Sequence, residues 1–424
     1  MAVPVIDLGF DRAEPDLSVR SSRRLSVLVV LTLVCVFAGP SAASPAPPRF
    51  VELFESASAD SFWLTPQALH IVAAEGTELT TYRLDGTPQW TVPLRRPQRA
   101  YSELQIDLAD GLILATVSGG TRPLASEISV YDEKTGELRW RAPGGVAFAA
   151  PGADKLLLHR DDEFEVVEPR TGAVAWTFRL PPGEQLDVPL PGRAPVDHLL
   201  LLDATGLLTV RDLATGQVRA ARQLPGPAAP RYAQSVGPLV LVSEPRPDGI
   251  ALSAYDRASL DPQWTVTGLP LETSVVSCPP VLCVTIADGL LVLDPDTGIQ
   301  LWGGGWIQAF GLGTPWPDGY LLGERFVAVG STEMMGFVVT ARTGKVVVDM
   351  RGWHPAAGSF GAPQPVVRRR IGGGRVWFGV VRPDLERVEP LGTLDDAWGP
   401  CAAVRDLLAC RTIDHRVRVW RVRG

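Results

Sequence analysis

The sequence predicts an all-β fold built from repeated strand–turn–strand units. One motif recurs along most of the chain, and its clearest copy is Leu291–Trp302, which reads LVLDPDTGIQLW. The 42 glycines and 38 prolines among 424 residues form no low-complexity tracts, which suits many short strands joined by turns. Short, continuously apolar runs precede most copies of the motif, as expected of buried inner strands.

Each copy of the motif reads as two strands joined by a tight turn. An apolar strand ends at an aspartate, and a Thr-Gly pair follows, in which glycine can adopt the positive φ that the turn needs. The returning strand ends in a tryptophan, whose large side chain can pack between neighbouring sheets. The residues expected to hold the repeats together are Trp90, Trp140, Trp176, Trp264, Asp294, Gly298 and Trp302.

Several copies depart from this pattern. Ala220 stands at the tryptophan position of the fourth copy, and the seventh has no tryptophan in that place, where Asp349 stands within one residue of the expected position. The fifth copy, which ends at Trp264, has Ser-Leu-Asp-Pro in place of the Thr-Gly turn. An eighth, degenerate copy is expected between Val376 and Leu391.

The spacing of the copies predicts a closed ring. Turn glycines at 86, 136, 172 and 216, and again at 298 and 344, lie 36 to 50 residues apart, a period that fits one four-stranded blade. The last strand, within His415–Gly424, has no room for a returning partner, so we expect Phe50–Phe54 to pair with it and to remove the open edges. Counting gives eight or nine units. With one unit shared, we predict an eight-bladed propeller over residues 50–424, with seven blades as the alternative.

The repeat resembles that of the PQQ-like (quinoprotein dehydrogenase-like) β-propeller family, and the chain looks like a non-catalytic bacterial member. Asp294, Thr297, Gly298 and Trp302 carry the resemblance best. The dehydrogenases of this family have two adjacent cysteines in a disulfide beside the quinone, together with calcium ligands and an aspartate base. This chain has no Cys-Cys pair. We therefore predict no enzyme activity, no catalytic residue and no cofactor, and a PQQ-dependent dehydrogenase is the alternative.

The N-terminus predicts an extracytoplasmic location for the propeller. Residues 1–24 form a polar tail that ends in arginines, residues 25–43 form an apolar span, and residues 44–49 form a Pro/Ala linker. The span reads either as an uncleaved signal anchor or as a signal peptide cleaved after Ala43. Arginines before the span and none directly after it place the tail in the cytoplasm. We expect a single-pass cell-membrane protein, and a secreted protein is the alternative.

The cysteines outside the apolar span form two local pairs. Cys278 with Cys283, and Cys401 with Cys410, each bracket a plausible turn between adjacent strands, and an oxidising exterior allows both to be disulfides. The five histidines, at 70, 159, 198, 354 and 415, are scattered. This scatter predicts no metal site and argues against an assembled Ser–His–Asp triad.

Charge and loops provide the remaining indications of function. A net charge of −7 gives no reason to expect nucleic-acid binding. The long connections Gly119–Glu127 and Trp353–Pro365 are the candidate contact loops. We predict a binding or protein-interaction scaffold whose partner is an extracytoplasmic protein or another cell-envelope component. A cell-wall polysaccharide-binding module is a further alternative, because basic residues gather at Arg368–Arg370 and on one face of the last strand, at Arg416 and Arg418.

Overall fold

The computed structural model divides the chain into two units, Met1–Pro48 and Arg49–Gly424. The residues that it describes are 50–73, 76–94, 103–109, 111–118, 127–148, 154–160, 163–188, 197–226, 231–271, 273–287, 289–304, 319–326, 334–356, 364–369 and 375–423. The predicted tail (1–24), apolar span (25–43) and linker (44–49) lie outside these residues. Within the described residues, no helix is long and apolar enough to span a membrane.

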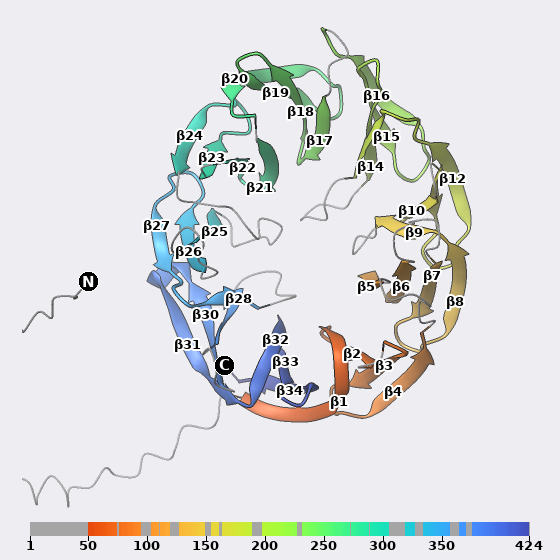
Figure 1. Ribbon diagram of the computed structural model, residues 1–424, viewed down its shortest axis with the longest axis vertical. Helices are drawn as coiled ribbons and strands as arrows, with labels where there is room; N and C mark the ends of the chain where they lie inside the picture. Colours follow the sequence, from red (N-terminus) through yellow and green to blue (C-terminus); the bar gives the residue numbers. More distant parts are fainter. Residues whose placement is uncertain are drawn as a thin grey trace, which may run out of the picture. The chain divides into compact units, whose positions relative to one another are not determined.

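The described residues form antiparallel sheets in which consecutive strands are neighbours (Figure 1). Five sheets have four strands each and come from the first three quarters of the chain. They are β5 (Glu103–Ala109), β6 (Leu112–Ser118), β7 (Glu127–Asp132) and β8 (Leu138–Pro143); β9 (Gly145–Phe148), β10 (Leu156–Arg160), β11 (Glu163–Val167) and β12 (Val174–Arg179); β13 (Gln185–Asp187), β14 (His198–Leu202), β15 (Leu207–Asp212) and β16 (Val218–Gln223); β17 (Tyr232–Val236), β18 (Leu239–Arg246), β19 (Gly249–Asp256) and β20 (Pro262–Leu269); and β21 (Ser274–Cys278), β22 (Val281–Ile286), β23 (Gly289–Leu293) and β24 (Gln300–Gly304).

The other sheets come from the two ends of the folded unit. They are the three-stranded β25 (Tyr320–Phe326), β26 (Met334–Thr340) and β27 (Val346–Asp349); the four-stranded β28 (His354–Pro355), β29 (Gln364–Arg369), β30 (Arg375–Arg382) and β31 (Arg387–Asp395); and the seven-stranded β32 (Ala397–Val404), β33 (Leu407–Thr412), β34 (Arg416–Val422), β1 (Phe50–Leu64), β2 (Ala68–Ala73), β3 (Glu78–Arg83) and β4 (Pro88–Pro93). A single 3₁₀ turn, η2 (Pro383–Leu385), is the only helical element of the described residues.

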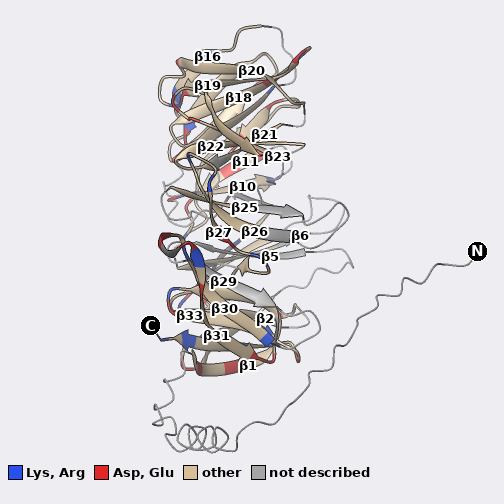
Figure 2. Ribbon diagram, turned by 90° about the vertical axis from the view of Figure 1, so that its left-hand side faces the viewer, with Lys and Arg blue, Asp and Glu red and all other residues tan. Residues whose placement is uncertain are grey.

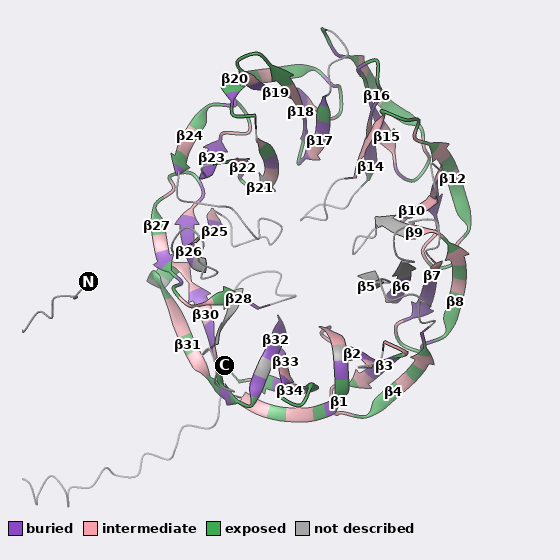
Figure 3. Ribbon diagram, in the orientation of Figure 1, coloured by how far each residue is buried: buried purple, intermediate pink, exposed green. Residues whose placement is uncertain are grey.

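Within Arg49–Gly424 the sheets stand around a central axis, so the fold is a β-propeller (Figure 1). The last strand of each sheet lies on the outer rim. The second strands are buried, as in β10, where Leu156, Leu157 and Leu158 are at most 2% exposed, because neighbouring sheets cover both of their faces (Figure 3). Outer strands such as β4, β8, β12 and β16 instead alternate between exposed and half-buried residues. The predicted inner strands are therefore confirmed.

The predicted ring closure is also confirmed. The first half of β1 pairs with β34, with Phe50 opposite Val422 and Glu55 opposite Arg418. The second half of β1 pairs with β2, and irregularities in both ladders mark the bend between the two halves. β1 therefore completes the last sheet and begins the first, which leaves neither end of the chain as a free edge.

The structure does not confirm the predicted eight blades, nor the alternative of seven. When the seven-stranded sheet is divided within β1, the described residues contain nine sheets. The predicted number of eight assumed that the first and last segments of the propeller together form one of the counted units. In the structure β34 has its own partners β32 and β33, in addition to β1, so the terminal strand belongs to a complete sheet separate from β28–β31. The turns of that sheet lack the Thr-Gly pair, which hid it from a motif count.

Candidate functional site

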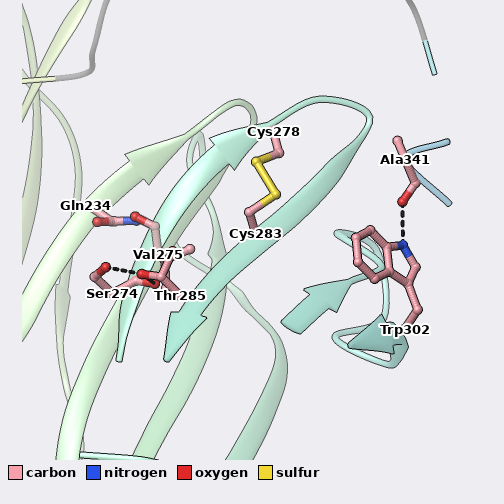
Figure 4. Close-up of a disulfide and its surroundings, with 8 residues drawn as sticks. All are labelled: Gln234, Ser274, Val275, Cys278, Cys283, Thr285, Trp302 and Ala341. Atoms are coloured by element: carbon pink, nitrogen blue, oxygen red, sulfur yellow. Dashed lines mark hydrogen bonds between the residues drawn. A yellow bond between two sulfur atoms is a disulfide. The ribbon is translucent and has the colours of Figure 1, made fainter. Parts of the chain in front are cut away.

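The repeat tryptophans join each sheet to the next one. Each indole N–H donates to a backbone carbonyl in the following sheet, at the residue directly after the position of the repeat aspartate. The pairs are Trp90 with Glu133 (3.0 Å), Trp140 with Pro169 (2.8 Å), Trp176 with Leu213 (2.9 Å), Trp264 with Pro295 (2.8 Å) and Trp302 with Ala341 (2.7 Å; Figure 4). The indoles therefore serve packing between sheets, as the sequence predicted.

The Thr-Gly turn is the surface against which the indole lies. The Oδ1 atom of Asp294 accepts hydrogen bonds from the backbone N–H of Asp296 and from the Thr297 hydroxyl, which fixes the turn. Gly298 has φ +70°, and a Cβ added there would lie 2.6 Å from Cε3 of Trp264. Glycine is needed at this position both for the backbone conformation and for the closeness of the indole.

A β-bulge aims each tryptophan at its turn. In the β7–β8 ladder Trp140 pairs with Val130 and Leu138 pairs with Tyr131, so Arg139 is the extra residue. Its guanidinium donates to Oδ2 of Asp132 at 2.8 Å, and this bond lowers the pKa of Asp132 to about 2. Arg219 occupies the same place in β16 and binds Asp212, whose pKa it lowers.

The junction between the β13–β16 sheet and the β17–β20 sheet replaces the tryptophan and the glycine together. Ala220 stands at the tryptophan position of β16, and Leu260 stands at the turn-glycine position of the next sheet. Leu260 is fully buried, has φ +59°, and packs in one cluster with Ala220. A large side chain on the turn thus fills the space that an indole fills elsewhere. Arg222 adds a hydrogen bond to the Leu260 carbonyl at 3.0 Å.

Both predicted cysteine pairs are disulfides, Cys278–Cys283 and Cys401–Cys410. Cys278 and Cys283 are at most 3% exposed and belong to an apolar cluster with Val281, Leu290 and Val292 (Figure 4). The two cysteines are five positions apart, so they do not form the disulfide of adjacent cysteines that the resemblance to quinoprotein dehydrogenases implies. The described residues also hold no group of three or more His, Cys, Asp or Glu side chains arranged to bind a metal ion.

The structure assembles a Ser–His–Asp arrangement that the sequence analysis missed. His198 Nδ1 lies 2.8 Å from Oδ1 of Asp197, and Nε2 lies 2.9 Å from the Ser235 hydroxyl. The prediction that the scattered histidines form no such arrangement is therefore wrong, because His198 contacts both an aspartate and a serine. Asp197 directly precedes the apolar strand β14, but Ser235 lies in the next sheet, 37 residues away. Local sequence gave no signal for that contact.

The exposure of these side chains is the reverse of what nucleophilic catalysis needs. The His198 side chain is 1% exposed, so it cannot reach a leaving group, whereas that of Asp197 is 48% exposed. A second carboxylate, Asp187, accepts the Ser235 backbone N–H at 2.7 Å, which would oppose negative charge developing beside the hydroxyl. The arrangement instead links β14 to β17 across two sheets.

The charges around His198 are set by burial and by arginines. Burial would raise the pKa of Asp197, but hydrogen bonds from Arg219 and His198 outweigh it and lower that pKa to about 2. Burial lowers the pKa of His198, and the bond to Asp197 opposes this effect in part. Burial raises the pKa of Asp187. A buried neutral imidazole thus lies between an ionised carboxylate and a hydroxyl.

The basic face of the last strand is present but neutralised. Arg416 and Arg418 point away from the buried Val417 and Val419, as predicted. Arg418 lies 3.1 Å from Glu55, and Arg416 lies 3.0 Å from Asp414; acidic residues of β1 are visible in Figure 2. Ion pairs therefore occupy this face, which weakens its candidacy for binding an anionic polymer. The side chains of Arg368–Arg370 are outside the described residues.

The two candidate contact loops connect strands at opposite ends of the propeller. Gly119–Glu127 joins the second and third strands of its sheet, and Trp353–Pro365 joins the first and second strands of another. Because successive strands are antiparallel, the strand ends that flank the two connections lie on opposite faces. Residues 119–126 and 357–363, which include most of both predicted loops, are outside the described residues.

Comparison with known proteins supports the resemblance indicated by the repeats. Residues 75–265 match a family model described as outer membrane protein assembly factor BamB. No curated protein sequence matches the chain. Solved structures similar to it are BamB from Moraxella catarrhalis (13% identity, 88% of this chain and 99% of that chain, TM-score 0.41), the computationally designed Ika8 protein (15%, 77% and 98%, 0.47) and the C-terminal WD40 domain of Sif2 (11%, 88% and 99%, 0.41).

Proposed function

We propose that this protein is a non-catalytic interaction scaffold of the cell envelope, held outside the cytoplasmic membrane by residues 25–43 as an uncleaved anchor. The observation that carries the proposal is the match of residues 75–265 to the BamB family model, whose description is an assembly factor for outer membrane proteins. The partner of this chain is accordingly an envelope protein. The described residues form nine sheets around a closed ring, which would give the partner a rigid surface.

The fate of the repeat residues supports a role in binding over catalysis. The five tryptophans that donate to the next sheet, and the turn glycine beneath each of them, are engaged between sheets, so they are not available to a ligand. The disulfide Cys278–Cys283 joins cysteines five positions apart, unlike the adjacent cysteines of the quinoprotein dehydrogenases. What the propeller offers a partner is its two faces and its outer rim.

Photo-crosslinking from the two faces tests the proposal. Leu271 and Ile299 are 71% and 66% exposed and flank outer strands of neighbouring sheets, β20 at its end and β24 at its start. They therefore report on opposite faces. A photoreactive amino acid at each site, in the full chain in its native host, should give a discrete protein adduct from one face and not from the other. Equal, diffuse labelling from both faces would count against a specific scaffold.

Two further measurements test the location and the absence of catalysis. Mass spectrometry of the membrane fraction should find an intact N-terminus, and cleavage after Ala43 would replace the anchor with a secreted protein. Purified protein supplied with pyrroloquinoline quinone and calcium should reduce no dye with alcohol or sugar substrates. Substrate-dependent dye reduction would overturn the non-catalytic assignment.

A further inference from the structure

The junction between the β13–β16 sheet and the β17–β20 sheet combines an apolar cluster, to which Leu200 and Leu260 belong, with a set of polar contacts. It lacks the tryptophan–glycine contact, because Ala220 and Leu260 occupy those positions. β13 and β14 both contact β17. The links across are His198 to the Ser235 hydroxyl, Asp187 to the Ser235 N–H, Gln185 to the Arg231 carbonyl, and Arg222 to the Leu260 carbonyl.

A closed ring allows one junction to open while the others hold. Each sheet of a repeat structure contacts its neighbours on two sides, and its stability is approximately a sum of such nearest-neighbour terms. Opening between β14 and β17 would leave the tryptophan junctions on both sides in place. It would also leave the β1–β34 closure intact. The opening therefore requires only the polar links and the apolar cluster of this one junction to separate.

We propose that this junction is an acid-sensitive opening point of the ring, at which protonation of His198 separates the β13–β16 sheet from the β17–β20 sheet. In the neutral imidazole Nδ1–H donates to Asp197, and Nε2 accepts the Ser235 hydroxyl proton. A second ring proton occupies Nε2, so the Ser235 hydroxyl can no longer donate there and must turn its hydrogen away and accept from the ring. The added charge is then buried, since the His198 side chain is 1% exposed.

The charged groups that face His198 come from four elements. Asp197 binds it directly, but that carboxylate is shared with Arg219 of β16 at 2.6 Å. Arg257, in the turn after β19, repels the imidazolium, as does Arg219. Asp187 of β13 lies on the far side of Ser235, to whose backbone N–H it is bonded. Two arginines thus oppose one directly bonded, already paired carboxylate.

The direction of the pH dependence follows from the closed and open forms. In the closed junction burial, followed by repulsion from Arg257, outweighs Asp197 and holds the pKa of His198 below its ordinary value of 6.5. In the open junction the hydrated imidazole titrates normally. The open form therefore binds the proton more tightly, so closure is fully favoured above the ordinary pKa and is lost as the pH falls towards the lowered one.

Hydrogen exchange of the full chain, read by mass spectrometry at about pH 7.5 and about pH 5.5, tests the proposal. After correction for intrinsic exchange rates, peptides covering β14 and β17 should exchange faster at the lower pH, by at most about tenfold per pH unit for one proton. Peptides covering β6 and β22, in the sheets beyond, should not change. Unchanged protection in β14 and β17 would overturn the proposal, as would a uniform loss over all sheets.

Two variants identify the titrating group. Arg257→Gln removes a repelling charge from a half-buried side chain that donates a hydrogen bond to the Gly237 carbonyl, so the ring should fold and the acid response should shrink. His198→Gln cannot titrate, and its β14 and β17 exchange should not depend on pH beyond the intrinsic rates. An acid response of wild-type size in both variants would refute the role of His198.

His70→Gln is the matched control. His70 is also fully buried and also bridges two sheets, from Thr81 at 2.8 Å to Glu133 at 3.2 Å. Its substitution should leave the acid response of β14 and β17 at the wild-type size. Loss of that response in His70→Gln would show that the effect is a general property of the ring, and would overturn the assignment to one junction.

Discussion

Replacement of both Ala220 and Leu260 should restore the tryptophan–glycine contact that other junctions make. We predict that Ala220→Trp and Leu260→Gly each destabilise the protein, whereas the double variant recovers most of the loss. The reason is that Leu260, fully buried against Ala220, occupies the place of the indole that lies on glycine in neighbouring junctions such as Trp264 with Gly298. The test is a double-mutant cycle on the free energy of unfolding.

The expected magnitudes follow from burial. Ala220→Trp forces an indole against Leu260, and such overpacking costs about 1–3 kcal/mol. Leu260→Gly empties the site of a leucine with no exposed surface, which costs about 2–5 kcal/mol, reduced by about 1 kcal/mol because the φ of +59° suits glycine. In the double variant the indole fills the cavity that the loss of Leu260 leaves, so we expect a coupling energy between the two substitutions of about 2 kcal/mol or more.

Urea titration of the full-length variants, followed by near-ultraviolet circular dichroism, measures the cycle, with equal m-values required for the comparison. As a control, Ala220→Trp combined with Gly237→Ala should show additive losses, because Gly237 lies outside the cluster that contains Leu260. If the two losses at Ala220 and Leu260 simply add, to within about 0.5 kcal/mol, then the large-for-small exchange does not describe this junction.

Three further predictions concern the repeats and the disulfides. Gly136→Ala should lower the free energy of unfolding by about 1–2 kcal/mol more than Gly237→Ala does. Both glycines have positive φ, but a Cβ at Gly136 would lie 2.6 Å from the Trp90 indole, whereas a Cβ at Gly237 meets no described atom within 4 Å. Equal losses would contradict the packing argument. Asp132→Asn should remove about 1–2 kcal/mol of stability, a figure discounted because the arginine partner is half-exposed. The lowered pKa of about 2 makes the carboxylate stabilising above its ordinary pKa of 3.8, and this contribution is lost as the pH falls through about 2, so stability should fall less steeply with acid in the variant. Urea midpoints between about pH 2 and 5 measure the difference, and an unchanged dependence on pH would refute the prediction. Replacement of both Cys401 and Cys410 by alanine should lower stability by about 2–4 kcal/mol. It should also reduce the response of unfolding to reductant without abolishing it, because Cys278–Cys283 remains, as thermal melts with and without dithiothreitol would show. A response of wild-type size would contradict a stabilising role for Cys401–Cys410.

The repeat and the buried strands could be predicted because each has a signal within a short stretch of chain. The ring closure could be predicted because the last strand has no following segment to pair with. The Asp-Thr-Gly turn depends on hydrogen bonds between residues two or three positions apart, as at Asp294. The disulfide Cys278–Cys283 spans one turn, so its partners are also local. The continuously apolar β10 identifies itself as an inner strand without reference to any other part of the sequence.

The number of sheets could not be predicted in the same way. The sheet of β32–β34 and β1 has no Thr-Gly turn, and its strands come from both ends of the folded unit. A motif count detects only sheets that carry the motif. Whether the terminal strand shares a sheet or completes its own depends on whether β32 and β33 lie beside it, which is decided by hydrogen-bond pairing.

The sequence by itself determined the all-β repeat, the turns, the cysteine pairing and the segments that close the ring, because these depend on periodicity and on neighbours along the chain. Only the tertiary structure decided which turn each tryptophan meets, that Leu260 compensates for Ala220, and that His198 lies between Asp197 and Ser235. These contacts join different sheets, tens of residues apart. The physical reason is that packing between sheets selects partners by shape and burial, and a repeating local pattern carries no record of that selection.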